Sequence, residues 1–293
     1  MTAALQSLLD LLDLEEIELN LFRGRSPQER SQRVFGGQVV GQALVAAYRT
    51  VEDRHVHSLK GDFLRPGDPK IPILYEVDRI RDGRSFTTRR VVAIQHGRAI
   101  FSMSVSFQIE ESGLEHQASM PDVPGPTETP DPHMYDEKLR AHLPPERRDW
   151  LDRVPPIESR PVRPIDPIDP EKRPPELAVW LRAAGGMPDD DRLHQCVLAY
   201  ASDMHLLDTC LLPHGISWLS PNFQSASLDH SIWFHRRFRA DEWLLFVQDS
   251  PSASGARGFN RGLVFTEDGR LIASVVQEGL IRLRGSDPSG GAA

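Results

Sequence analysis

The stretch RVFGGQVVGQALVAAYRTV, residues 33–51, decides the fold, because it has the length of a helix and is small and apolar on every side. A helix without a polar face belongs inside a core. Its start is unusual, since Gly36 and Gly37 each lower helix propensity by roughly 1 kcal/mol relative to alanine. Two interpretations are open at this point. The glycines form a tight entry turn, or they let a ligand approach the free N–H groups that a helix exposes at its start.

Outward from this helix, residues 73–108 predict three antiparallel strands. The sequence ILYEVDRIRDGRSFTTRRVVAIQHGRAIFSMSVSFQ contains three β-rich runs, divided at Asp82-Gly83 and His96-Gly97 as hairpin turns divide strands. In the last run apolar and polar residues alternate. One face of this strand therefore covers a core, with Phe101, Met103, Val105 and Phe107 on it.

The same plan recurs in the second half of the chain. Residues 243–282, WLLFVQDSPSASGARGFNRGLVFTEDGRLIASVVQEGLIR, again contain β-rich runs, with Asp268-Gly269 at the second turn. The segments GRAI at 97–100 and GRLI at 269–272 lie 172 positions apart, and FLRP at 63–66 and FHRR at 234–237 lie 171 apart. Residues 189–215 predict a second long apolar helix, opened by aspartates and ended by Pro213 and Gly215.

Each half thus reads as a strand, a buried helix and several antiparallel strands. A helix that is apolar all round can be satisfied by a curved sheet wrapped about it, the arrangement called a hot dog. We therefore predict an α+β protein with a tandem, or double, hot-dog fold.

The predicted domains are an N-terminal hot-dog unit at 1–110, a linker at 111–175, a C-terminal hot-dog unit at 176–285 and a disordered tail at 286–293. The linker holds 15 of the 24 prolines, a density that blocks regular structure and favours an extended path. Short amphipathic pieces within it predict that it packs over a surface.

The composition is that of an ordinary globular protein, with 293 residues, 39% of them hydrophobic and 26% charged. A formal net charge of −8 argues against general nucleic-acid binding. No apolar run approaches the roughly 18 residues needed to cross a bilayer, and the acidic opening segment does not resemble a secretory signal. Cys196 and Cys210 lie too far apart in one predicted helix for a disulfide. We expect a cytoplasmic protein that binds neither nucleic acid nor membrane.

Six segments resemble acyl-CoA thioesterase II, the TesB type, in which one chain carries two hot-dog units: FGGQVVGQALVAA, HSLKGDFLRPGD, DGRSFTTRRVVAIQHGR, DHSIWFHRRF, SASGARGF and SVVQEGLIR. The resemblance covers residues 10–283 and is weakest in the proline-rich linker. It implies hydrolysis of an acyl-CoA thioester to a free fatty acid and coenzyme A, without a metal or bound cofactor. It also implies a homo-oligomer, a dimer or tetramer of double hot dogs.

The resemblance further implies a set of site residues. In that family an aspartate on the second helix, a threonine on the next strand and a glutamine on the last strand hold the attacking water. The matching positions in this chain are Asp203, Ser227 and Gln277. Serine departs from the family's threonine, because it keeps the hydroxyl but loses the methyl group that restricts its rotamer.

The residues themselves support this trio unequally. A thioester hydrolase must orient a water, accept its proton and stabilise an oxyanion. Asp203 offers a carboxylate inside an apolar helix, where a charge is costly unless it is paired or used. Gln277 lies 172 positions after the inward-facing Val105, so an amide replaces a core valine. Ser227 is weaker support, because a serine at the start of a strand commonly lies in a turn or on the surface.

For substrate binding we expect backbone donors from Gly36, Gly37 and Gln38 near the thioester, where the first helix approaches the acyl-CoA or the second half. Arg257 could meet the coenzyme A phosphates, although solvated strand arginines are common. The other conspicuous residues are interpreted as structural, because His55 and His57 lack the further ligands of a metal site and the rest have ordinary roles as satisfied polar groups: His205, Asp208, His230 and His235.

Two alternative functions remain open. A hot-dog enoyl-CoA hydratase would need an aspartate and a histidine with four residues between them, whereas Asp208 and His214 have five. A non-catalytic acyl-CoA binding module would have the pocket without the water-activating trio.

Overall fold

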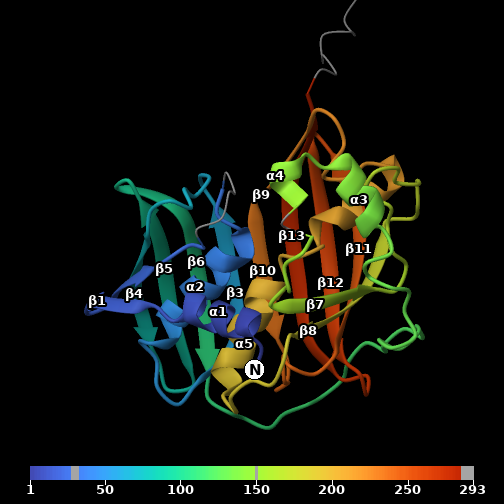
Figure 1. Cartoon of the computed structure of the whole chain (residues 1–293). Helices are drawn as coiled ribbons and strands as arrows, with labels where there is room; N and C mark the ends of the chain where they lie inside the picture. Colours follow the sequence, from blue (N-terminus) through green and yellow to red (C-terminus); the bar gives the residue numbers. More distant parts are fainter. Residues whose placement is uncertain (28–32, 149–150, 285–293) are drawn as a thin grey trace, which may run out of the picture.

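The computed structural model of the chain describes residues 1–27, 33–148 and 151–284. These residues form one antiparallel sheet of 13 strands, with α1, α2 and α5 packed against its centre (Figure 1). The first half contributes the order β1-β2-β4-β5-β6-β3, and the second half contributes β10-β13-β12-β11-β8-β7, with β9 added against β13. The halves join where β3 pairs with β10, opposing Ser231 and Lys60.

The first half places one central helix among six strands. Its elements are α1 (Ala3–Leu12), β1 (Glu15–Glu18), β2 (Leu21–Gly24), α2 (Gly36–Tyr48), β3 (His55–Phe63), β4 (Ile73–Asp82), β5 (Phe86–Gln95) and β6 (Arg98–Gln108). The predicted hairpins are confirmed, and at the second turn both His96 and Gly97 have positive φ. The four apolar residues that alternate along β6 are all buried.

The second half repeats this plan. Its elements are β8 (Glu176–Ala183), α5 (Asp191–Ala201), the 3₁₀ helix η1 (Leu207–His214), β9 (Phe223–Ser227), β10 (Asp229–Phe234), β11 (Leu244–Ser254), β12 (Arg257–Thr266) and β13 (Leu271–Leu283). The register confirms the repeat, because Val105 on β6 opposes Arg89 on β5 and, in the second half, Gln277 on β13 opposes Asn260 on β12. The tandem hot-dog arrangement predicted from the repeat is therefore confirmed.

The helices α2 and α5 pack against each other and form the part of the core that joins the two halves. Eleven of the thirteen residues of α2 are buried, all except Gly36 and Val45. Two glycines of α2 lie against α5: a Cβ at Gly37 would collide with the carbonyl oxygen of Tyr200, whereas one at Gly41 would make an ordinary contact with the carbonyl oxygen of Cys196. Bare backbone on α2 thus allows the two helices to pack closely.

One sequence prediction is wrong in this core. Residues 189–215 do not form a single helix: α5 is capped at its start by the Asp190 side chain and ends at Ser202, and His205 adopts a left-handed φ of 64° before η1 begins. The helix ends beside the start of α2, where Tyr200 of α5 lies against Gly37. Asp203 therefore lies just beyond the end of a helix and not inside one.

The proline-rich stretch 111–175 is more regular than predicted. It contains α3 (Asp136–His142), α4 (Pro145–Arg148) and β7 (Ile157–Pro161), an edge strand paired with β8. An edge strand tolerates a terminal proline such as Pro161, because no ladder hydrogen bond is lost there. The expected packing over a surface is confirmed, since the indole of Trp180 donates to the carbonyl of Pro124 at 2.9 Å. The unit boundaries remain predictions, and the predicted tail at 286–293 lies outside the described residues.

Candidate active site

Three side chains predicted from the repeat and the motifs meet beside the start of α2. Asp203 follows α5, Ser227 ends β9, and Gln277 lies in the middle of β13. The Gln277 amide donates to Asp203 Oδ1 at 2.5 Å, and the Ser227 hydroxyl donates to the same oxygen at 3.3 Å. Residues from distant parts of the second half thus converge on one carboxylate.

The first half supplies the third donor to this carboxylate. The backbone N–H of Gly37 donates to Asp203 Oδ2 at 2.8 Å, so the carboxylate receives an N–H group from the first turn of α2. Negative charge is favoured at a helix N-terminus, where N–H groups lack intrahelical acceptors. This helix start therefore helps to offset the cost of removing the Asp203 charge from water.

The glycines that open α2 have a geometric role here. A Cβ at Gly36 would lie 2.7 Å from Asp203 Oδ2, and one at Gly37 would collide with the backbone carbonyl of Tyr200. The rings of Phe35 and Tyr200 meet edge to face at 5.1 Å beside this contact. Close approach of the two halves, and not an entry turn, explains the bare backbone.

A fourth side chain joins the cluster from β10. The nitrogen of the Gln277 amide also lies 3.2 Å from His230 Nδ1, and His230 Nε2 lies 2.8 Å from Ser202 Oγ. His230, Ser202 and Gln277 are all fully buried. Burial lowers the pKa of His230, and the neighbouring Asp203 carboxylate opposes that shift. The imidazole is therefore held in its neutral form at neutral pH.

The oxygen of the same amide is left over. Among the described residues, Gln277 Oε1 is buried and has no hydrogen-bond partner. A buried amide oxygen without a partner costs roughly 1–3 kcal/mol. Asp203 also keeps unused capacity, because a carboxylate offers about four acceptor positions and three donors reach it here. Gln277 Oε1 and the Asp203 carboxylate can thus both accept a hydrogen bond from one molecule that has two O–H bonds to donate.

His230 is interpreted from the sequence as a structural residue, and the hydrogen bonds show that it belongs to the same cluster as Asp203 and Gln277. The signal was present in the repeat. His230 lies 171 positions after Leu59, an inward-facing and fully buried residue on β3. A core leucine is thus replaced by a titratable ring, just as Val105 is replaced by Gln277.

The side chains of two other predicted site residues lie apart from this cluster. The Gln38 amide is buried and donates to the carbonyl of Arg25 at 3.1 Å and to Ser26 Oγ at 3.0 Å, so it holds the chain after β2. Arg257 pairs with Glu278 at 2.9 Å. Glu278 follows the inward-facing Gln277 directly, so Arg257 and Glu278 lie on the opposite face of the sheet.

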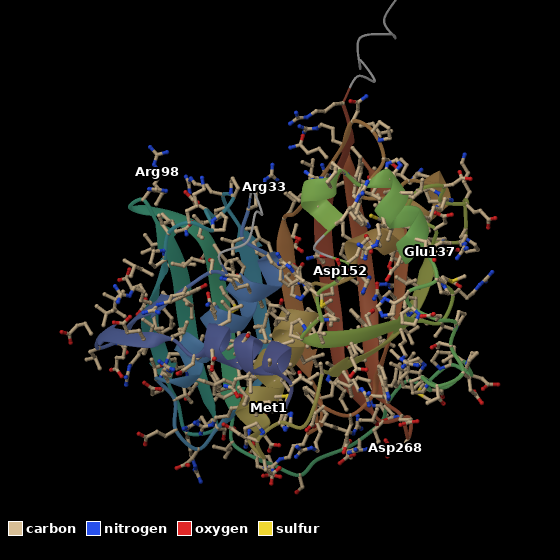
Figure 2. All side chains as sticks on the ribbon, viewed as in Figure 1. Met1, Arg33, Arg98, Glu137, Asp152 and Asp268 are labelled. Atoms are coloured by element: carbon tan, nitrogen blue, oxygen red, sulfur yellow. The ribbon has the colours of Figure 1, made fainter. Side chains whose placement is uncertain are left out.

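The surroundings of the cluster can be followed in the figures. Arg33, which precedes α2, lies at the upper rim between the two halves (Figure 2). Asp268, in the turn between β12 and β13, lies at the other end of the molecule.

Other chemistries find little support in the described part of the chain. No group of three or more histidine, cysteine, aspartate or glutamate side chains there is arranged to hold a metal ion. Cys196 and Cys210 are free and buried, and burial raises the pKa of both thiols, that of Cys210 to about 11. No helix in the described ranges is both long enough and apolar enough to span a membrane.

Comparison with known proteins gives consistent matches along the chain. A family model described as acyl-CoA thioesterase matches residues 170–280, and one described as acyl-CoA thioesterase N-terminal domain matches residues 25–108. Human acyl-coenzyme A thioesterase 8 is 44% identical over 283 residues, which cover 94% of this chain and 88% of the human protein. Acyl-CoA thioesterase 2 of Haemophilus influenzae is 42% identical, with 96% of this chain and 99% of that protein covered.

A solved structure matches the whole fold. The crystal structure of the acyl-CoA thioesterase II TesB2 from Mycobacterium marinum superposes with a TM-score of 0.78 at 42% identity, covering 96% of this chain and 100% of the other.

Proposed function

We propose, from the premise that this chain belongs to the acyl-CoA thioesterase family and is a thioester hydrolase, that Asp203, Ser227 and Gln277 activate a water for attack on a fatty acyl-CoA. The products are a free fatty acid and coenzyme A. The observation that carries this assignment is the unpartnered, buried Gln277 Oε1 beside the donor-rich carboxylate of Asp203.

The two free acceptors define the orientation of the water. One O–H of the water donates to Gln277 Oε1 and the other to Asp203, so a lone pair of the water oxygen faces away from both groups. A water held in this way presents its nucleophilic side to a thioester carbonyl carbon placed opposite. The Ser227 hydroxyl and the Gly37 N–H keep the carboxylate in position through their own hydrogen bonds.

The chemical step then follows from these contacts. The water oxygen bonds to the carbonyl carbon while Asp203 takes the proton, and the π electrons of the carbonyl move to its oxygen. The N–H groups of Gly36 and Gln38, in the first turn of α2, stabilise that oxyanion. When the tetrahedral intermediate collapses, the C–S bond breaks and the thiolate of coenzyme A leaves with the proton from Asp203.

Phosphate recognition is a separate part of the proposal. Arg257 is assigned to the coenzyme A phosphates, because a guanidinium binds a phosphate oxygen pair well. Its present partner is Glu278, so phosphate binding would exchange one anion for another. This contact lies on the outer sheet face, and substrate would have to reach it around the edge of the site.

The alternative functions are disfavoured by specific features. Asp208 lies 3.5 Å from His205 Nδ1 and has five residues between it and His214, which is not the hydratase spacing. A binding module without catalysis would leave no reason to place a carboxylate with unused acceptor positions beside a buried, unsatisfied amide oxygen.

The test is Asp203→Asn, which keeps the shape of the side chain and removes the base. We expect thiol release from acyl-CoA to fall by about 10²- to 10⁴-fold, the usual contribution of a general base, while a non-hydrolysable thioether analogue of acyl-CoA still binds. Equal rates for Asp203→Asn and the parent would refute the role of Asp203. If the protein instead hydrates an enoyl-CoA, measured as loss of the absorbance of the conjugated double bond, the hydratase function is favoured.

We further infer a homo-oligomer, a dimer or tetramer of double hot dogs, in a cytoplasmic setting. Support comes from the strands that end the sheet, β1 and β7, which leave backbone groups available for pairing. The two free cysteines suit a reducing compartment. Light scattering tests the assembly, and fractionation of the source cell tests the location.

A further inference from the structure

The hydrogen bonds around Gln277 extend into a buried chain that the proposed reaction does not use directly. The chain runs from Asp203 through the Gln277 amide and the His230 ring to Ser202, and the Ser202 hydroxyl lies 3.1 Å from the carbonyl oxygen of Ala199. Each of these side chains except Asp203 is fully buried. The last acceptor belongs to the backbone of α5 and cannot rotate.

The donors and acceptors along this chain can be assigned in only one way. Ionised Asp203 has no proton to give, so the nitrogen of the Gln277 amide must face it. The second N–H of the same nitrogen then meets His230 Nδ1, which must be unprotonated to accept it. The proton of the neutral ring therefore lies on Nε2 and is donated to Ser202 Oγ, whose own hydroxyl donates to Ala199.

We propose that His230, oriented by Ser202, is a positioning residue that fixes the Gln277 amide with its nitrogen toward Asp203 and its oxygen toward the attacking water. This inference rests on the proposed function of Gln277. Without an acceptor at Nδ1, one amide N–H would be buried without a partner, and the amide could turn over. A turned amide would present a second acceptor to Asp203 and a donor to the water, which reverses both contacts.

The repeat supports this role for His230. The β10–β13 pair opposes Ser231 and Val276, and the next step of the same antiparallel register brings His230 opposite Gln277, where their side chains meet; in the first half Leu59 opposes Val105. The half that carries a glutamine at this cross-strand pair carries a histidine beside it, and the half that carries a valine carries a leucine. The two polar residues thus occur together.

The kinetic test uses His230→Leu, which installs the residue that the first half carries at the matching position, and His230→Asn, whose Oδ1 replaces Nδ1 as an acceptor. We expect His230→Leu to lower kcat by about 10- to 100-fold with KM within about threefold. His230→Asn should recover most of that loss, because it again accepts from Gln277. His235→Leu is the matched control, since His235 also pairs with a serine, Ser274 at 2.8 Å, but outside the site.

The decisive measurement is a double-mutant cycle with Gln277→Val. If His230 acts through the amide, His230→Leu should change kcat by less than about twofold when Gln277 is already absent. A full and additive loss in both backgrounds would overturn the proposal. An active Gln277→Val protein would instead refute the proposed function itself, so the two failures can be told apart.

A measurement on the parent protein tests the proposal even if the variants do not fold. Labelling the histidine ring nitrogens with ¹⁵N and recording their chemical shifts reports the tautomer of each ring. We expect a buried neutral His230 with its proton on Nε2. A proton on Nδ1 would leave no acceptor for the amide and would overturn the proposal.

Discussion

A single methyl group at the start of α2 should separate activity from stability. In Gly36→Ala the new Cβ would lie 2.7 Å from Asp203 Oδ2 and 3.0 Å from the ring of Phe63. Carbon and oxygen normally approach no closer than about 3.3 Å, so the carboxylate must retreat by about 0.6 Å. That shift stretches its 2.8 Å hydrogen bond from the Gly37 N–H beyond the usual range of about 2.7–3.2 Å.

The expected magnitude follows from this displacement. A misplacement of about 1 Å in a catalytic group can lower a rate by about 10²-fold, so we expect kcat of Gly36→Ala to fall by about 10- to 100-fold. Stability should change little, because alanine improves helix propensity by up to about 1 kcal/mol and thereby opposes the local crowding. The melting temperature should stay within about 4 °C of the parent.

The assay is thiol release at several acyl-CoA concentrations, together with a thermal melt. Gly41→Ala is the matched control on the same helix, because its Cβ meets only the mobile end of Leu12 closely, at 3.0 Å. It should keep activity within about twofold. A Gly36→Ala protein with parental kcat would show that the position of the Asp203 carboxylate does not limit turnover.

Three further outcomes are expected. Gln277→Val should lower thiol release by about 10- to 1000-fold in folded protein. Val105→Ala should lower the free energy of unfolding by about 1–3 kcal/mol and leave turnover per folded molecule unchanged. A fully active Gln277→Val protein, or a folded but inactive Val105→Ala protein, would refute the assignment of one site to the second half. Ser227→Thr should preserve activity and Ser227→Ala should slow it by about 2- to 10-fold, since one hydrogen bond to the carboxylate is lost; equal rates for all three proteins would remove Ser227 from the site. Stability should fall between about pH 7.5 and pH 5.5, because histidines whose pKa is lowered in the folded protein take up protons on unfolding; the groups are the buried His194 and His230 and the more exposed His57 and His235. Urea midpoints that do not move would contradict this.

Much of the fold follows from local sequence patterns. The alternation in β6 and the turns that contain glycine depend on neighbouring residues, so the sequence predicts them. The offset of 172 positions identifies Gln277 as the repeat counterpart of Val105. The end of α5 could not be predicted in this way. Residues 189–215 are helix-like in composition, but the chain turns at Ser202 and His205, where it meets the start of α2 from the other half.

The candidate site was predicted from the family resemblance, with support from the repeat for Gln277, and the contacts made to it by other elements were not predicted. Asp203 and Gln277 do meet, as the resemblance implied, whereas the hydrogen bond from the Gly37 N–H to Asp203 joins residues 166 positions apart and could not be predicted from local patterns. His230 was missed because a lone histidine on a strand is commonly structural. Gln38 was predicted as a backbone donor near the thioester, and that role stays a prediction. Its side-chain amide is directed to the chain after β2, since successive residues on a helix face different sides.

The internal repeat gives the first half a location equivalent to the candidate site, around Val105, and different residues occupy it. Arg89 on β5 opposes Val105, as Asn260 on β12 opposes Gln277. The Arg89 guanidinium is buried and donates to Thr50 Oγ1 at 2.9 Å, to the Thr50 carbonyl at 3.1 Å and to Asp82 at 2.6 Å.

A buried cation at this position opposes the same chemistry in the first half. A carboxylate introduced there would pair with Arg89 and would not be free to take a proton from water. Val105 can neither hold a water nor orient a base, and Leu59 beside it offers no hydrogen bond. The duplication therefore preserves the scaffold in both halves. Three inward positions on adjacent strands differ: they carry valine, leucine and arginine in the first half and glutamine, histidine and asparagine in the second. Under the proposed function, this difference restricts catalysis to the half that ends with β13.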